Sequence, residues 1–290
     1  MSTQEEDDRI RDEQREAWRL AGPAWERRRE TLAQQSSPVT DRVLALADLQ
    51  PGQHVIDLAC GAGGLSVEIA RRVGSRGSVL GLDISDTMVA AARRYAQRER
   101  VANVEFRVIE RELDLGVEAE AFDCATCRGA LMFMPDPTRA MQSLYKALRP
   151  DGRVVIATLG SPERCSMLRI PAEVVAQHVD GVAPRAGRPG VFGVPSPAHL
   201  TAHFEGAGFV VTHTATLQGP PTEYDSPEQF WDQVTQSAGF LVLLLRSLTQ
   251  ERRDALLATA KEKLTVIFGD STITLSLEHL IGAGVRPKAS

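Results

Sequence analysis

A short apolar run that leads into a glycine-rich turn limits the fold of this chain more than any other segment. Residues 53–57 end in the carboxylate of Asp57, and Gly61 and Gly63 follow before an amphipathic stretch at residues 65–72. Glycine has no Cβ, so it lets the backbone approach a ligand closely and adopts strained turns. A helix that begins behind such a turn offers unpaired N–H groups. The segment therefore predicts a strand–turn–helix cradle for a nucleotide-like ligand.

The following hundred residues alternate short β-branched runs with longer helical patterns. The runs predict strands at residues 53–57, 79–83, 104–109, 122–127 and 153–158, and the helical patterns predict helices at residues 39–47, 65–72, 86–97 and 137–148. Proline and glycine mark turns before the first and fifth strands. Such alternation is typical of an α/β fold, a mostly parallel sheet with helices on both faces.

The rest of the chain divides into further parts. We expect residues 1–37 to form a helical arm, which serves as a lid, an interface or a packed arm, and residues 38–160 to form the core. Residues 161–196 are rich in proline and glycine and predict a mobile insertion with a short helix at 172–178. Residues 197–290 complete the sheet and carry a helical insertion at 226–268. Within this last part the patterns predict helices at 197–206, 227–248 and 250–267 and strands at 209–217 and 273–285.

The charge and hydropathy of the chain exclude several classes of partner. The 290 residues carry a net charge of -5, which gives no basic footprint for nucleic acid or an anionic membrane. The first sixteen residues mix acids and bases and do not form a secretory signal. The apolar run at residues 239–245 is too short to span a bilayer. We therefore expect a soluble, cytoplasmic protein that acts on a small molecule, with a homodimer built from the N-terminal arm as a possible assembly.

The cysteines and most histidines favour structural roles. Cys124 and Cys127 stand three apart in a strand, where their side chains point to opposite faces, so they cannot jointly hold a metal. His199 and His203 share one helix face but lack a third ligand. We predict no metal site, and we interpret the cysteines as small buried residues.

The glycine spacing distinguishes between two nucleotide classes. A dinucleotide turn needs glycine at its first, third and sixth positions, whereas this turn has Gly61, Gly63 and then Ser66. Asp57 is also foreign to that motif, which disfavours an NAD(P)-dependent oxidoreductase. The pattern acid-x-x-x-Gly-x-Gly instead resembles the first motif of the class I S-adenosylmethionine-dependent methyltransferases, especially those of quinone biosynthesis and natural-product tailoring.

Further segments carry the same resemblance. Asp83 ends the second strand about 20 residues beyond the turn, where an acid accepts ribose hydroxyls. Residues 122–128 and 130–137 are similar to the family motif beside the transferred methyl group, and residues 148–153 are similar to the loop before the fifth strand. The resemblance implies a Rossmann-like, seven-stranded sheet whose antiparallel edge hairpin comes from residues 209–217 and 277–284, with helical lid insertions.

The resemblance also implies a cofactor, S-adenosyl-L-methionine, which leaves as S-adenosyl-L-homocysteine. The cofactor-binding residues it implies are Asp57, Ala59, Gly61, Gly63, Asp83, Ile84, Met88, Glu110, Arg111, Cys127, Arg128 and Trp25. Several have simpler alternative roles.

Asp57 can cap the helix behind it, and Glu110-Arg111 can be a solvated charge run. Arg128 can contact the methionine carboxylate, the acceptor or only solvent. Trp18 and Trp25 can cover the cofactor or pack in a core.

The reaction implied is methyl transfer to a small, largely apolar acceptor, driven mainly by positioning. The absence of a clear His/Asp or Lys/Asp pair favours catalysis by proximity, or a base that the sequence does not reveal. O-, N- and C-methylation all remain open, because the insertions carry no recognised motif. His178 is the one histidine considered as a general base, with a structural role as its alternative. We expect the acceptor between residues 131–133, 161–196 and 227–267. An alternative is an enzyme that binds the same cofactor for a non-methylating reaction such as a cyclisation.

Overall fold

Seven strands form one sheet at the centre of the protein. They are β1 (His54–Leu58), β2 (Ser78–Asp83), β3 (Val104–Val108), β4 (Phe122–Arg128), β5 (Leu148–Leu159), β6 (Val210–Gln218) and β9 (Glu278–Val285). The computed structural model describes residues 3–179, 186–269 and 271–288. Residues 180–185 of the predicted mobile insertion therefore lie outside the described residues.

The order of the strands is β3-β2-β1-β4-β5-β9-β6. Strands β1 to β5 run parallel, and β9 runs antiparallel to both β5 and β6. The predicted α/β fold, with its mostly parallel sheet and antiparallel pair at one edge, is confirmed. The chain leaves β1 toward β2 and β3 and later returns to β4 on the other side. Ligands of such sheets bind at this switch point, outside the carboxyl ends of the strands.

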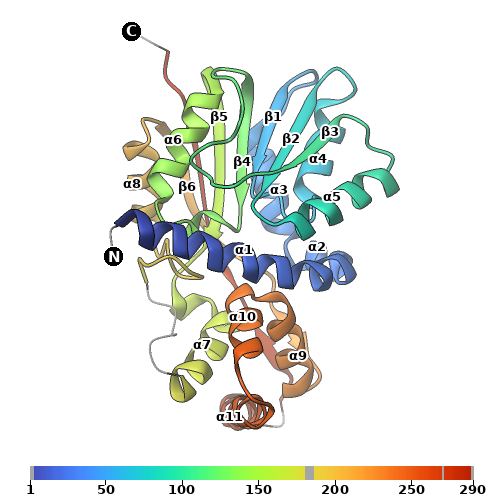
Figure 1. Ribbon diagram of the computed structural model, residues 1–290, viewed down its shortest axis with the longest axis vertical. Coiled ribbons are helices and arrows are strands. Elements are labelled where there is room, and N and C mark those ends of the chain that lie inside the picture. Colours follow the sequence, from blue (N-terminus) through green and yellow to red (C-terminus); the bar gives the residue numbers. More distant parts are fainter. Residues whose placement is uncertain (1–2, 180–185, 270, 289–290) are drawn as a thin grey trace.

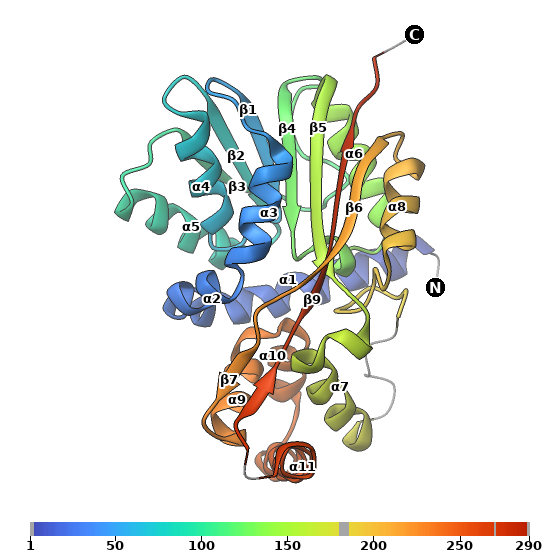
Figure 2. The ribbon, with the colours of Figure 1, turned by 180° about the vertical axis from the view of Figure 1, so that it is seen from behind.

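Helices cover both faces of the sheet (Figures 1 and 2). α3 (Ser37–Ala47), α4 (Gly64–Val73) and α5 (Asp86–Arg98) lie on one face, and α6 (Pro137–Ala147) and α8 (Pro197–Gly206) lie on the other. Successive strand residues supply the two buried layers. Val55 packs toward α3 and α4, whereas Ile56 packs toward α6 and α8. Burial on both faces explains the nearly continuous apolar runs of these strands.

A second, smaller part has its own core. It contains a two-stranded sheet of β7 (Thr222–Tyr224) and β8 (Ile273–Leu275) and the helices α7 (Ser166–His178), α9 (Pro227–Ser237), α10 (Gly239–Ser247) and α11 (Gln250–Phe268). Phe230, Leu256 and Leu264 are buried at its centre. Short 3-10 helices, η1 (Leu131–Phe133) and η2 (Pro162–Arg164), follow β4 and β5.

Three elements of this part differ from the sequence prediction. The single helix predicted at 227–248 is broken at Ala238, whose φ of -84° and ψ of 110° end α9 before α10 begins. A Cβ added to Gly239 would lie 3.4 Å from the Cβ of Ala17, so the break brings α10 close to α1. The predicted strand 273–285 divides into β8 and β9, because the Ser276 N–H donates to Ser166 Oγ of α7 at 3.0 Å where the chain passes between the two sheets. β7 was not predicted, since three residues are too few to show a period.

The N-terminal arm joins the two parts. It consists of α1 (Thr3–Arg27) and α2 (Arg29–Gln35), and α1 crosses the lower end of the sheet between it and the smaller part (Figure 1). The Trp25 indole N–H donates to the Ser237 carbonyl at 2.9 Å. On the core side, the Thr87 hydroxyl donates to the Arg19 carbonyl at 2.9 Å. Helix α1 therefore forms a roof that is hydrogen-bonded to both parts.

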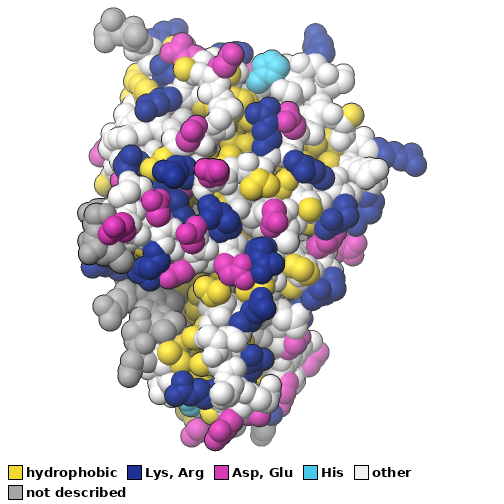
Figure 3. Space-filling model, in the orientation of Figure 1, with side chains coloured by type: hydrophobic (Ala, Val, Ile, Leu, Met, Phe, Trp, Pro, Cys, Tyr) yellow, Lys and Arg dark blue, Asp and Glu magenta, His cyan; other side chains and the backbone are white. Residues whose placement is uncertain are grey.

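The surface carries charges of both signs. Basic and acidic side chains are interspersed on the face shown in Figure 3, in keeping with the small net charge of -5. In the part of the chain that the structure describes, no helix is long and apolar enough to cross a membrane.

Phe204 of α8 allows a test of the packing at the sheet edge. Its ring lies over Gly282 and Gly284 of β9, where an added Cβ would come within 2.6 Å and 2.8 Å of a ring carbon. We expect Phe204→Ala to lower the free energy of unfolding by about 3–5 kcal/mol, because it removes a fully buried ring and leaves a cavity. Urea denaturation followed by circular dichroism measures this change. The matched control is Val266→Ala, at a side chain 80% exposed on α11, which should change stability by less than about 0.5 kcal/mol.

Candidate functional site

A cavity of about 360 Å³ opens at the switch point of the sheet. Its walls come from the carboxyl ends of the strands, from the arm that roofs them, and from the smaller part below. Of the residues predicted to bind a cofactor, eight line it: Asp57, Ala59, Gly61, Asp83, Ile84, Met88, Arg128 and Trp25. The cavity thus brings together residues from the first strand, the second strand, the fourth strand and the arm.

Asp57 is a buried carboxylate that joins three elements. Its Oδ2 accepts from Ser66 Oγ of α4 at 2.5 Å, and its Oδ1 accepts from Thr126 Oγ1 of β4 at 2.7 Å. Burial raises the pKa of Asp57, and these two hydroxyls oppose that rise. The N-cap of α4 is Gly63, which has no side chain to cap the helix, and Asp57 reaches the first turn of α4 through Ser66. The alternative role of Asp57, a carboxylate that favours the start of this helix, stays a prediction. Ser66, which the sequence marked only as a departure from the dinucleotide turn, holds this carboxylate in place.

The two glycines of the turn have different tasks. Ala59, Gly61 and Gly63 all have positive φ, at 57°, 55° and 85°, a conformation that presents successive backbone N–H groups to a ligand. A Cβ added to Gly61 would meet nothing within 4 Å, whereas one added to Gly63 would lie 2.9 Å from the Cβ of Ala92. Gly61 therefore keeps the backbone open to the cavity. Gly63 lies outside the cavity lining and lets the turn pack against α5.

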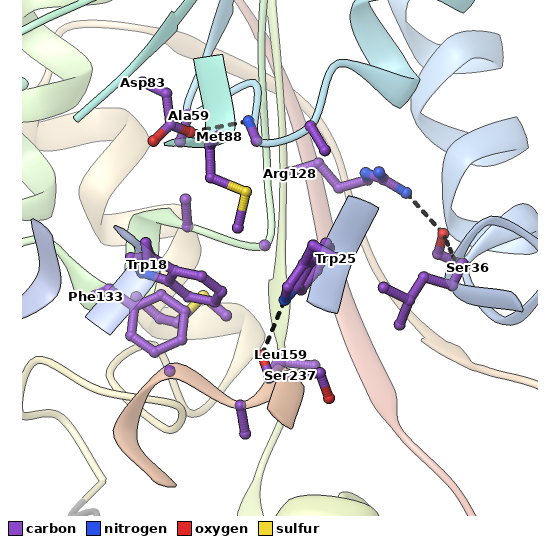
Figure 4. Close-up of a pocket in the computed structure, with 18 of the residues that line it drawn as sticks. Trp18, Trp25, Ser36, Ala59, Asp83, Met88, Arg128, Phe133, Leu159 and Ser237 are labelled. Carbon is purple, nitrogen blue, oxygen red and sulfur yellow. Dashed lines mark hydrogen bonds between the residues drawn. The ribbon is translucent and has the colours of Figure 1, made fainter. Parts of the chain in front are cut away.

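Asp83 holds the turn from the neighbouring strand. Its Oδ2 accepts from the Gly61 N–H and its Oδ1 from the Ser85 N–H, both at 2.9 Å. Burial raises the pKa of Asp83 to about 6, and these N–H groups oppose the rise. Each carboxylate oxygen keeps a further lone pair for a ligand hydroxyl. Asp83 lies near Met88 at the upper end of the cavity in Figure 4.

The wall beside Asp83 is apolar and ends in a buried ion pair. Ile84, Met88 and Ile109 line it, whereas Glu110 and Arg111 are exposed and lie outside the lining. Further along the same segment, Glu112 is buried and lines the cavity. Its Oε1 accepts from Arg11 Nε at 3.0 Å and from Arg11 Nη2 at 2.9 Å. Arg11 therefore ties α1 to the segment after β3.

Two arginines approach the opposite end of the cavity. Arg128 is partly buried rather than a surface residue, and its Nη1 donates to Ser36 Oγ at 3.0 Å and to Thr40 Oγ1 at 2.8 Å. Arg29 donates from Nη1 to the Ala62 carbonyl at 2.6 Å. The Nε of Arg29 is buried without a hydrogen-bond partner among the described residues. A buried N–H of this kind normally has an acceptor; the Arg29 guanidinium also lies over the Tyr95 ring, with its Cζ 3.9 Å from the ring centroid.

Aromatic side chains of the arm cover the middle of the cavity. The Trp18 ring lies edge-on to Trp25, with 5.8 Å between centroids, and edge-on to Phe133, with 5.4 Å. Figure 4 shows Trp18 against Phe133, and Trp25 directed toward Ser237. Both tryptophans line the cavity, so their packing role and their predicted roof role are compatible.

The remaining candidates lie away from the cavity. Cys127 is fully buried in the layer under α6, Cys124 is buried in the opposite layer under α3, and burial raises the pKa of both thiols. Their side chains point to opposite faces as predicted. His178 is at the exposed end of α7, hydrogen-bonded to Thr259 Oγ1 at 2.7 Å. Within the described ranges, no three metal-ligating side chains gather.

Some cavity residues were not identified from the sequence. Tyr224 and Gln233 line it from the smaller part, and His279 lines it from β9. Glu112 and Arg29 belong to the same set. None of them stands in a motif, because each reaches the cavity from an element far from the glycine turn in sequence.

The comparison with protein families now decides the kind of site. Residues 49–183 match the family model described as a methyltransferase domain, and this range contains the turn, Asp57, Asp83 and Arg128. Residues 49–183 form a class I S-adenosylmethionine-dependent methyltransferase domain. The predicted family resemblance is confirmed.

Relatives of the methyltransferase domain act in biosynthesis, according to their names. The ubiquinone/menaquinone biosynthesis C-methyltransferase UbiE of Marinomonas sp. is 34% identical over 121 residues, covering 41% of this chain and 48% of the relative. Nocamycin O-methyltransferase of Saccharothrix syringae is 32% identical over 149 residues, covering 51% and 53%. The chain thus spans about half the length of these relatives.

Solved structures share the fold of the methyltransferase domain at low identity. The protein BH2331 of Bacillus halodurans has a TM-score of 0.59 and 18% identity, over 86% of this chain and 99% of its own. The [4+2]-cyclase SpnF has a TM-score of 0.55 and 17% identity, over 87% and 81%. At these identities the likeness concerns the fold alone.

The buried ion pair between Arg11 and Glu112 provides a test of how the arm is held. Both side chains are about 95% buried, so Arg11→Met should lower the free energy of unfolding by about 3–5 kcal/mol by leaving Glu112 without its cation. The double variant Arg11→Met/Glu112→Leu should regain most of that loss. Chemical denaturation of the three proteins measures both effects. Arg9→Met, which removes an exposed pair with Glu13, is the control and should change little; equal losses in the single and double variants would contradict this account.

Proposed function

We propose that the protein transfers a methyl group from S-adenosylmethionine to a small, largely apolar acceptor. The observation that carries this proposal is the cavity in which the Asp83 carboxylate and the open backbone at Gly61 meet inside a methyltransferase domain. The names of the relatives, which act in quinone and natural-product biosynthesis, support a small-molecule acceptor.

The residues of the cavity fit this cofactor. Asp83 would accept the ribose hydroxyls through its free lone pairs, and Ile84 and Met88 would form the apolar walls of the adenine site. At the other end, Arg29 and Arg128 would bind the methionine carboxylate, which gives the orphaned Nε of Arg29 an acceptor. Gly63, Glu110, Arg111 and Cys127 lie outside the cavity, and we assign them no contact with the cofactor.

The task of the protein in this reaction is mainly to position the reactants. Bound S-adenosylmethionine supplies a methyl carbon that its sulfonium already makes electrophilic. Ala59 and Gly61 would hold the donor end, and Trp18 and Trp25 would exclude water above it. Alignment of reactants can contribute about 7–11 kcal/mol of the barrier. Few polar side chains are therefore needed on the acceptor side.

Calorimetry with S-adenosylhomocysteine tests the proposed function. The wild-type chain should bind it, and Asp83→Ala should weaken binding about 10- to 100-fold, because hydrogen bonds to a carboxylate contribute about 1.5–3 kcal/mol each. Cys127→Ser, in the same sheet but outside the cavity, is the matched control and should bind as wild type. Absence of binding to the wild type, or binding of NADH in its place, would refute the proposal.

The raised pKa of Asp83 predicts how binding depends on pH. The folded pKa of about 6 lies above the ordinary value of 3.8, so the folded state holds this proton more tightly than the unfolded chain. The contribution of Asp83 to stability therefore falls as pH rises from about 4 to about 6. Cofactor binding has the opposite dependence, because only the carboxylate accepts two hydroxyls. The affinity for S-adenosylhomocysteine at pH 5 should be about tenfold below its value above pH 7, and calorimetry of Asp83→Asn should show no such change.

A further inference from the structure

The part of the cavity beyond the predicted cofactor site is lined mostly by apolar side chains. We call it the acceptor chamber and define it by Phe133, Leu159, Met167, Val234, Leu277 and His279. These come from η1, β5, α7, α9, β9 and, for Leu277, the segment between β8 and β9, so both parts of the protein contribute to it. Phe133 and Leu159 lie below Trp18 and Trp25 in Figure 4. A chamber of this composition suits an aromatic or fused-ring molecule, whose rings pack against thioethers and aromatic edges.

His279 stands where the chamber meets the carboxyl ends of the strands. His279 is on β9, where it pairs with Leu159 of β5 on one side and with Leu217 of β6 on the other. Since side chains alternate along a strand, it shares a sheet face with Ile281, which packs in the layer under α3. Arg128 is on that face as well, because its guanidinium donates to Thr40 of α3. The imidazole and the guanidinium therefore meet at one end of the cavity.

The imidazole of His279 is available to a ligand. No hydrogen bond joins its ring to any of the described residues, although the side chain is partly buried. Burial, followed by the positive charge of Arg128, lowers the pKa of His279 to about 4. Arg128 is the charged group that acts on it among the described residues. At neutral pH the ring is uncharged, with one nitrogen free to accept a proton.

We propose that the acceptor is an apolar aromatic molecule with a hydroxyl group, and that His279 accepts its proton during methyl transfer. This inference rests on the proposed function. The acceptor O–H bond breaks and its proton bonds to a ring nitrogen of His279, while the oxygen electron pair forms the bond to the methyl carbon. The carbon–sulfur bond breaks with its electron pair on sulfur, which becomes neutral. The imidazolium then gives its proton to water.

The position of Arg128 would make His279 a stronger base when S-adenosylmethionine is bound. A methionine carboxylate beside Arg128 offsets the guanidinium charge, so the proton affinity of His279 rises when the cofactor is bound. His178, the base considered from the sequence, is exposed on α7 and takes no part in this site.

The test measures how 1-naphthol, which has two fused rings and one hydroxyl, ionises when bound. The full chain is first saturated with S-adenosylhomocysteine, and naphtholate absorbance is then followed across pH for the bound probe. A neutral imidazole that accepts the hydroxyl proton stabilises the un-ionised probe, so the apparent pKa of bound 1-naphthol should be higher in wild type than in His279→Leu or His279→Phe by about one unit. His178→Gln is the matched control and should resemble the wild type. A change in packing alone would act in the opposite direction, because an apolar side chain that removes water from around the probe raises its pKa in the variants.

The possible outcomes are separable. Failure of S-adenosylhomocysteine to bind would refute the proposed function itself. Its binding without binding of 1-naphthol would overturn the acceptor class. Equal apparent pKa values for 1-naphthol in wild type and in both His279 variants would overturn the role of His279.

Discussion

The buried carboxylate of Asp57 is the interaction on which the rest of the site depends. It receives hydroxyl hydrogen bonds from Ser66 of α4 and Thr126 of β4, so it joins the two strands that flank the switch point to the helix behind the turn. A buried carboxylate without such partners would be costly. With both oxygens satisfied, it holds the turn in a shape where Gly61 can reach Asp83 on the next strand. The cradle is thus built from three elements that meet at one charge.

The second constraint is the roof that α1 provides. A Rossmann-like sheet alone leaves its switch point open to solvent, and here Arg11, Trp18 and Trp25 cover it from the N-terminal arm. Contacts of α1 with both α5 and α10 make the arm a common wall of the proposed cofactor site and the proposed acceptor chamber. A ligand that enters the middle of the cavity therefore touches parts of the chain more than 200 residues apart, as the bond between Trp25 and Ser237 shows.

The sequence predicted those features that depend on residues close together in the chain, and it missed those that depend on contacts between distant elements. The strands and helices of the core show clear periods, and Asp83 stands at a fixed distance from the turn, so both could be predicted. The break at Ala238 could not, because the residues of α9 and α10 continue one helical pattern, and the break lies where Gly239 approaches α1. Glu110 illustrates the same limit. The segment after β3 was located correctly, but the carboxylate that lines the cavity is Glu112, selected by Arg11 from a distant helix.

The sequence by itself determined the family, the order of the core elements and the cradle at Gly61 and Asp83, because these depend on local periodicity and on residues close together in the chain. Only the tertiary structure decided what surrounds the cradle. Ser66 became the partner of Asp57, Arg29 became a partly buried cation whose Nε lacks a partner among the described residues, and His279 became an imidazole beside Arg128 without a hydrogen bond to those residues. Each of these roles arises from burial and from neighbours supplied by other elements. The spacing of residues along the chain predicts none of the three.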